Sequence, residues 1–120
     1  KWPIYKPELT EEHIVGYYKG KPIYKKYVED NLPDAKTSGT YVDKLLDISD
    51  WNVEHIIRTY GVLQTDTFET DLPMSSGANS NHFCRIITRP QTNKITIRNT
   101  YTGYNGFPIR FLVEYTKTTD

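Results

Sequence analysis

The segment from Ile109 to Tyr115 alternates between apolar and polar positions, with Arg110 and Glu114 in the polar set. The apolar set falls on every second position and consists of Ile109, Phe111, Val113 and Tyr115. Side chains two residues apart share a face of a β-strand, so this pattern predicts a strand with one face in the core. A strand of this kind needs a sheet to pair with, which constrains the whole chain toward β structure.

The composition agrees with this expectation. Thr, Ile and Val together contribute 32 of the 120 residues and Tyr contributes 10, whereas Ala, the best helix former, occurs twice. Seven Gly and seven Pro are spread along the chain and suit many turns between short strands. The length is that of one ordinary domain. We therefore expect an all-β fold, an antiparallel, jelly-roll-like β-sandwich of about seven or eight strands.

The order of the strands can be partly read along the chain. Two β-prone runs flank Lys19-Gly20 and predict a hairpin whose turn uses a positive φ at Gly20. The run 41–48 fits either a helix or a strand, and we favour a strand. A strand over 53–63 contains Gly61, which suggests a bulge or a close backbone approach. We also expect a short strand over 65–70 and a loop over 75–81.

Residues 1–9 contain two prolines and predict an extended lead-in or linker from a longer parent chain, followed by a head domain over 10–120. Fifteen basic and fifteen acidic side chains give a net charge of zero, which disfavours nucleic acid as a partner. Membrane insertion is not expected, because no apolar run approaches the roughly 18 residues of a membrane helix. The single cysteine, Cys84, rules out an internal disulfide and is expected to be a small buried residue in a strand.

No constellation in the sequence carries catalysis. The histidines match no metal-ligand spacing, and neither a nucleophile elbow nor a phosphate-binding loop is present. We therefore expect no enzyme activity, no catalytic residue, no metal and no cofactor. Aromatic side chains in predicted loops are the candidates for ligand binding, because a tyrosine or tryptophan offers a flat apolar face and a polar tip. The candidate set, with its neighbouring amide, is Trp51, Tyr101, Tyr104 and Asn105.

Two end segments carry a resemblance to a known family. Residues 10–26 read TEEHIVGYYKGKPIYKK, and residues 109–120 read IRFLVEYTKTTD. Together they resemble the opening and the close of a C-terminal β-rich domain that recurs in tail-fibre, baseplate and minor structural proteins of phages and prophages of Gram-positive and gut bacteria. Tyr18 stands where that pattern usually has Trp, and Lys19 stands where it usually has an acidic residue.

The resemblance implies a non-enzymatic head domain of a tail fibre or other virion structural protein, which acts outside the cell after assembly in the host cytoplasm. It implies a homotrimer that binds a host cell-surface glycan or protein, with several shallow sites adding avidity. Two alternatives remain open at this point. One is a structural trimerisation or capping module without receptor binding, and the other is a carbohydrate-binding module attached to an enzyme.

Overall fold

The computed structural model describes residues 12–76 and 79–120, without the side chains of 74–81. The expected lead-in over 1–9 lies outside the described residues. The described residues form nine strands and three short 3₁₀ turns, which are β1 (His13–Tyr18), β2 (Lys21–Asn31), β3 (Val42–Asp47), η1 (Ser49–Trp51), β4 (Val53–Gln64), β5 (Glu69–Asp71), β6 (Met74–Ser76), β7 (Asn79–Arg89), η2 (Pro90–Thr92), β8 (Lys94–Asn99), η3 (Thr102–Tyr104) and β9 (Pro108–Lys117).

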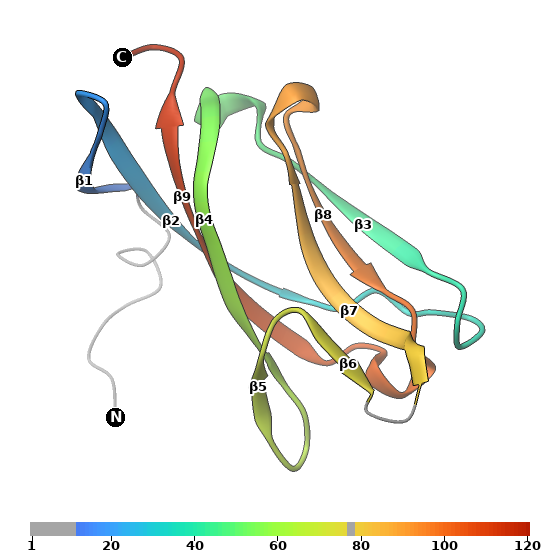
Figure 1. The fold of residues 1–120 in the computed structure, drawn as a ribbon. Coiled ribbons are helices and arrows are strands. Elements are labelled where there is room, and N and C mark those ends of the chain that lie inside the picture. The colour runs from blue at the N-terminus through green and yellow to red at the C-terminus, as the bar shows by residue number, and fades with distance from the viewer. Residues whose placement is uncertain (1–11, 77–78) are drawn as a thin grey trace.

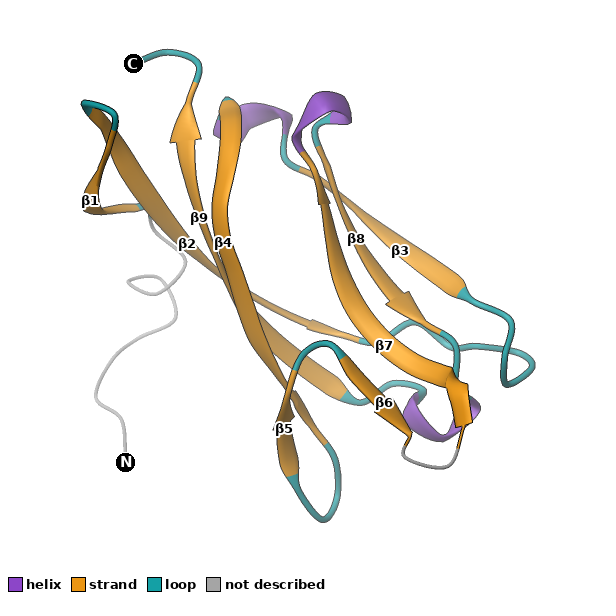
Figure 2. Cartoon of the chain, viewed as in Figure 1, coloured by secondary structure: helices purple, strands orange, loops and turns teal. Residues whose placement is uncertain are grey.

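The strands form two antiparallel sheets (Figures 1 and 2). One sheet has the order β1-β2-β9-β4-β5 and the other has the order β3-β8-β7-β6. The chain changes sheet between β2 and β3 and again between β3 and β4, and β9 returns to lie between β2 and β4 (Figure 1). Two antiparallel sheets with the core between them confirm the predicted all-β sandwich. Two of the strands, β5 and β6, are only three residues long.

The core lies between the two sheets and is built from alternate positions of the central strands. The four apolar positions of β9 predicted to face inward are all at most 2% exposed. Ile95 and Ile97 of β8 are fully buried opposite them in the same cluster, as is Cys84 of β7. The alternation read from the sequence therefore places the inner faces of the sheets correctly. It also leaves the other positions of β9 on the outer face of the five-stranded sheet.

The hairpin of β1 and β2 is confirmed. Its two-residue turn has φ of 51° at Lys19 and 82° at Gly20, and positive φ at both positions is what a type I′ turn requires. From this turn β2 runs far enough to pair with β9 over eight residue positions, from Tyr24 opposite Tyr115 to Asn31 opposite Pro108.

The sequence predicts either a bulge or a close backbone approach at Gly61, and the structure shows the close approach. Gly61 lies opposite Phe111 in the β4–β9 pairing. A Cβ built on Gly61 would come within 2.6 Å of both the Arg110 carbonyl oxygen and the Phe111 Cβ. The register shifts of β4 lie elsewhere, between Val53 and His55 and between Ile56 and Arg58.

Two sequence expectations are wrong. The strand expected over 65–70 is mostly a turn, because Thr65 accepts hydrogen bonds at its hydroxyl from the backbone of Thr67 and Phe68 and donates its own N–H to the Phe68 carbonyl. The loop expected over 75–81 is largely strand, since β6 ends at Ser76 and β7 begins at Asn79. Small polar residues predict a loop from local preference, and pairing with neighbouring strands overrides that preference here.

Candidate functional site

The outer face of the five-stranded sheet is lined by the alternate residues of its central strand. Because the other positions of β9 are buried in the core, Arg110, Leu112, Glu114 and Thr116 point away from it. These side chains lie between β2 on one side and β4 on the other. Leu112 is the apolar residue in this otherwise polar row.

Two tyrosines flank Leu112 across the sheet. Tyr27 of β2 and Tyr60 of β4 are both paired with Leu112 in the strand register. Neighbouring strands are about 4.8 Å apart, so the Cα atoms of the two tyrosines are about 10 Å apart. Together with Arg58 and Arg110, these three residues line a hollow with a volume of about 480 Å³. The result is an apolar floor with an aromatic ring on each side.

Charged groups hold both tyrosines. The Tyr27 hydroxyl donates to Glu29 over 2.8 Å, and the Tyr60 hydroxyl donates to Glu114 over 3.4 Å. The Arg58 guanidinium lies 4.3 Å from the centre of the Tyr60 ring, a cation–π contact. Burial of the Tyr27 phenol, together with the Glu29 carboxylate, raises its pKa to about 12. Both phenols are therefore held in place by hydrogen bonds to carboxylates.

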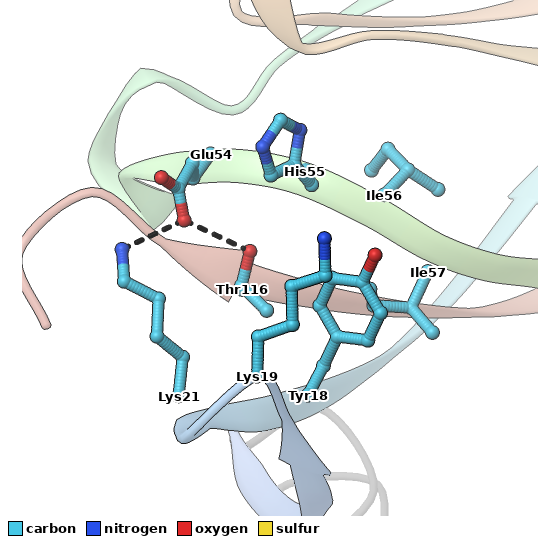
Figure 3. Close-up of a pocket in the computed structure, with 8 residues that line it drawn as sticks. All are labelled: Tyr18, Lys19, Lys21, Glu54, His55, Ile56, Ile57 and Thr116. Carbon is cyan, nitrogen blue, oxygen red and sulfur yellow. Dashed lines mark hydrogen bonds and ion pairs between the residues drawn. The ribbon is translucent and has the colours of Figure 1, made fainter.

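A second hollow, with a volume of about 730 Å³, lies farther along β9 at Thr116 (Figure 3). Glu54 is its anchor, because it accepts hydrogen bonds from Lys21 at 2.7 Å and from the Thr116 hydroxyl at 3.3 Å. The contact with Lys21 lowers the pKa of the Glu54 carboxyl below its ordinary value. Figure 3 shows Tyr18 and Lys19 entering this hollow from the hairpin turn. This second hollow has both polar and apolar side chains in its lining.

A third hollow of about 400 Å³ is lined by Pro108 and Arg110 at the other end of β9. There Arg110 donates to Glu69 at 2.6 Å and to Gln64 at 3.3 Å. The three hollows lie along the outer face of β9, where the first and the third share Arg110 and the second shares no lining residue with either. We call this surface the β9 groove, defined by Tyr27, Tyr60, Arg110, Leu112, Glu114 and Thr116, of which Glu114 lines none of the three hollows and Thr116 is buried. From Pro108 to Thr116 it extends about 26 Å at the usual rise per strand residue.

The residues expected to bind ligand from sequence do not come together. Three of them lie in the β8–β9 connection, and Trp51 lies in η1 near the opposite end of β9, where the Asn52 carbonyl accepts from Thr118. Tyr104 is only 6% exposed and belongs to the core cluster. Tyr101 is half-buried between His82, with ring centres 4.5 Å apart, and Tyr104, at 4.7 Å.

Asn105 and Trp51 also have structural contacts. The Asn105 side chain accepts from the Ala35 N–H at 2.7 Å and donates to the Ala35 carbonyl at 2.8 Å. Trp51 is half-buried and stacks on Tyr115 with ring centres 5.5 Å apart, while the Lys26 ammonium lies 4.7 Å from its ring centre. A ligand-binding role for any of the four stays a prediction.

Sequence reasoning missed Tyr27 and Tyr60. Tyr27 and Tyr60 lie in runs that predict strands, and Leu112 interrupts the polar face of the strand over 109–115, which is a weak signal. The sequence does not show that Tyr27, Leu112 and Tyr60 are neighbours, because the strand register that brings them together cannot be predicted from it.

Within the described ranges, no group of three or more His, Cys, Asp or Glu side chains could hold a metal ion, and no helix is long and apolar enough to cross a membrane. Comparison with protein-family models, with curated proteins and with solved structures finds no match.

Proposed function

We propose that the protein is a non-enzymatic head domain of a phage tail fibre or another virion structural protein, and that it binds a host cell-surface polysaccharide through the β9 groove. The virion setting rests on the resemblance of the two end segments. The binding mode rests on one observation, the cross-strand row of Tyr27, Leu112 and Tyr60 with charged side chains along its borders.

A polysaccharide suits this surface for chemical reasons. A sugar ring has an apolar face that packs on a tyrosine ring or a leucine side chain, and its hydroxyls accept from and donate to charged groups. Arg58, Arg110 and Glu114 offer such groups beside the row. Three separate hollows lie along one strand, which favours a weak contact with several units of a polymer over tight capture of a small molecule.

Repetition would compensate for weak individual sites. A fibre that carries several copies, three in the homotrimer implied by the resemblance, converts later binding events into intramolecular ones. Affinity for a surface then exceeds that of one groove without any new contact.

The test is binding to a panel of immobilised polysaccharides, measured for the wild type and for the single variants Tyr27→Ala and Tyr60→Ala. Each variant should weaken binding about tenfold, which corresponds to about 1.4 kcal/mol. The matched control is Tyr41→Ala, because Tyr41 is an exposed tyrosine stacked on Arg98 of the other sheet, with the guanidinium 3.9 Å from its ring centre. Equal losses in all three variants would reject the groove as the site.

The panel also separates this proposal from a purely structural module. The apolar edge strand β1 favours that second candidate, because exposed apolar side chains suit contacts between subunits. A structural module would bind no polysaccharide in the panel and would not adhere to host cells. Absence of binding by the wild-type protein would therefore contradict the proposed polysaccharide binding without any comparison of variants.

A further inference from the structure

Exposed apolar side chains are concentrated on one strand. Among the described residues, seven large hydrophobic side chains are exposed, and four of them belong to the six residues of β1. The four are Ile14, Val15, Tyr17 and Tyr18, of which Tyr17 is the most exposed at 71%. Such a concentration on one short segment differs from the scattered exposure that is normal on protein surfaces.

Among the described strands, β1 is also an edge strand, with β2 as its one neighbour in the sheet. Proteins usually protect edges by shortening them or by placing Lys or Pro on them. The other edges of the described sheets follow this practice, because β5 and β6 have three residues each and β3 carries Asp43, Lys44 and Asp47. β1 has six residues without Lys or Pro, and its one protective feature is the register shift between Ile14 and Gly16, since a β-bulge also protects an edge.

We propose that β1 pairs antiparallel with β1 of a second copy of the chain, about a two-fold axis at Gly16, with Val15 as the extra residue of the β-bulge in each copy. This register places Ile14 of each copy opposite Tyr17 of the other, an aliphatic–aromatic pair of the kind that stabilises sheets. It also places Glu12 opposite Lys19, so opposite charges meet at both ends of the apolar stretch. The strand is thus complementary to itself in both apolar character and charge.

Glu12 precedes β1 and is held by two contacts with β9. Its carboxylate already accepts hydrogen bonds from Lys117, at 2.5 Å, and from the Tyr115 hydroxyl. These two contacts hold Glu12, the residue before β1, against β9 at the centre of the sheet. The Lys19 ammonium is exposed at the hairpin turn, 5.4 Å from the Tyr18 ring centre, and is free to move toward a second carboxylate.

Pairing at β1 would join five strands from each copy into one continuous sheet of ten. The two-fold axis would stand perpendicular to the sheet, so both β9 grooves would face the same side. Five strand spacings would separate the two β9 strands, a distance of about 24 Å. Two grooves at this spacing would bind one polymer or one surface together. This consequence rests on the proposed function, whereas the pairing of the two β1 strands is independent of it.

The first test is the solution mass of the full 120-residue chain by light scattering across a range of concentrations. A strand pair buries less than the roughly 800 Å² per partner of a standard interface, so the mass should rise from one chain to two with concentration. Tyr17→Lys should keep the chain at one-chain mass, and Phe68→Lys, a matched change at an exposed residue of the β4–β5 turn, should not. Thermal unfolding verifies that both variants are folded.

The second test fixes the register. The double variant Ile14→Cys with Tyr17→Cys should form a covalent dimer on oxidation at concentrations where the two-chain mass is seen. Each single variant should not, because neither residue lies opposite its own copy. A one-chain mass at every concentration would overturn the proposal, and so would a three-chain mass or a two-chain mass that Tyr17→Lys leaves unchanged. Polysaccharide binding by the Tyr17→Lys variant then tests the groove independently of pairing.

Discussion

Replacing Gly61 with alanine tests how closely β4 and β9 are packed beneath the β9 groove. An added Cβ would meet the Arg110 carbonyl oxygen and the Phe111 Cβ at 2.6 Å each, and the Phe111 Cα at 3.0 Å. Ordinary contacts between such atoms are about 3.5 to 4.0 Å. All three atoms belong to the backbone or are bonded to it, so no side-chain rotation relieves the overlap, and the two strands must separate by up to about 1 Å.

The expected cost follows from two opposing terms. Alanine gains about 0.5 to 1 kcal/mol over glycine in a strand through lower conformational entropy of the unfolded chain. Overpacking of a well-packed core costs about 1 to 3 kcal/mol, and this site lies at the upper end because the overlap involves backbone. We expect a net loss of about 2 kcal/mol. For a chain of this length, that lowers Tm by about 8 °C.

The assay is thermal unfolding followed by circular dichroism, with Gly16→Ala as the matched control. A Cβ on Gly16 would meet only the Ile23 Cδ1 atom, at 3.9 Å, so this change in β1 should leave Tm equal or slightly higher. Both variants are compared at the lowest workable protein concentration, so that association does not contribute. If Gly61→Ala unfolds at the same temperature as Gly16→Ala, the close approach of β4 and β9 is refuted.

Two further changes test side-chain contacts by their effect on stability. Asn105→Ala removes the bonds to the Ala35 backbone and to the Asn99 amide, and denaturant titration should show a loss of about 2 kcal/mol without any ligand; an unchanged midpoint would contradict a structural role. Asp43→Asn breaks the bidentate contact with Arg98, which lowers the pKa of the Asp43 carboxyl below its ordinary 3.8. Because the folded pKa is the lower one, the contribution is full above about pH 3.8 and is lost as the pH falls through the folded value. The variant should therefore be about 1 kcal/mol less stable at neutral pH, with a gap that closes in acid, and a gap that widens there would contradict the contact.

The inner faces of the sandwich could be predicted because burial leaves a period of two in the sequence. The alternation from Ile109 to Tyr115 marks the buried face of β9 correctly, and the hairpin turn at Lys19-Gly20 is visible in its residue types. Which strands become neighbours could not be predicted, because no local pattern states that β9 lies between β2 and β4. The β9 groove depends on that arrangement, since Tyr27 and Tyr60 meet only through their shared neighbour Leu112.

The loop residues chosen as binding candidates show the converse difficulty. Tyr104 lies in an aromatic, Gly-rich connection, which is typical of an exposed turn, yet the connection folds over the end of the core and buries the ring. Asn105 looks like a solvent-facing amide, yet it holds the backbone at Ala35. Residue type indicates what such side chains can contact, and the path of the loop decides whether they contact solvent or protein.

The position of β9 has a consequence for how the chain acquires its shape during synthesis. This strand is the centre of the larger sheet, yet of all the described strands it is the last to leave the ribosome. Until it emerges, β2 and β4 have no partner between them, and their apolar faces remain open to other chains. Long-range pairing of this kind folds slowly. A chain truncated just ahead of β9 would therefore lack both the floor of the β9 groove and the central strand of the larger sheet.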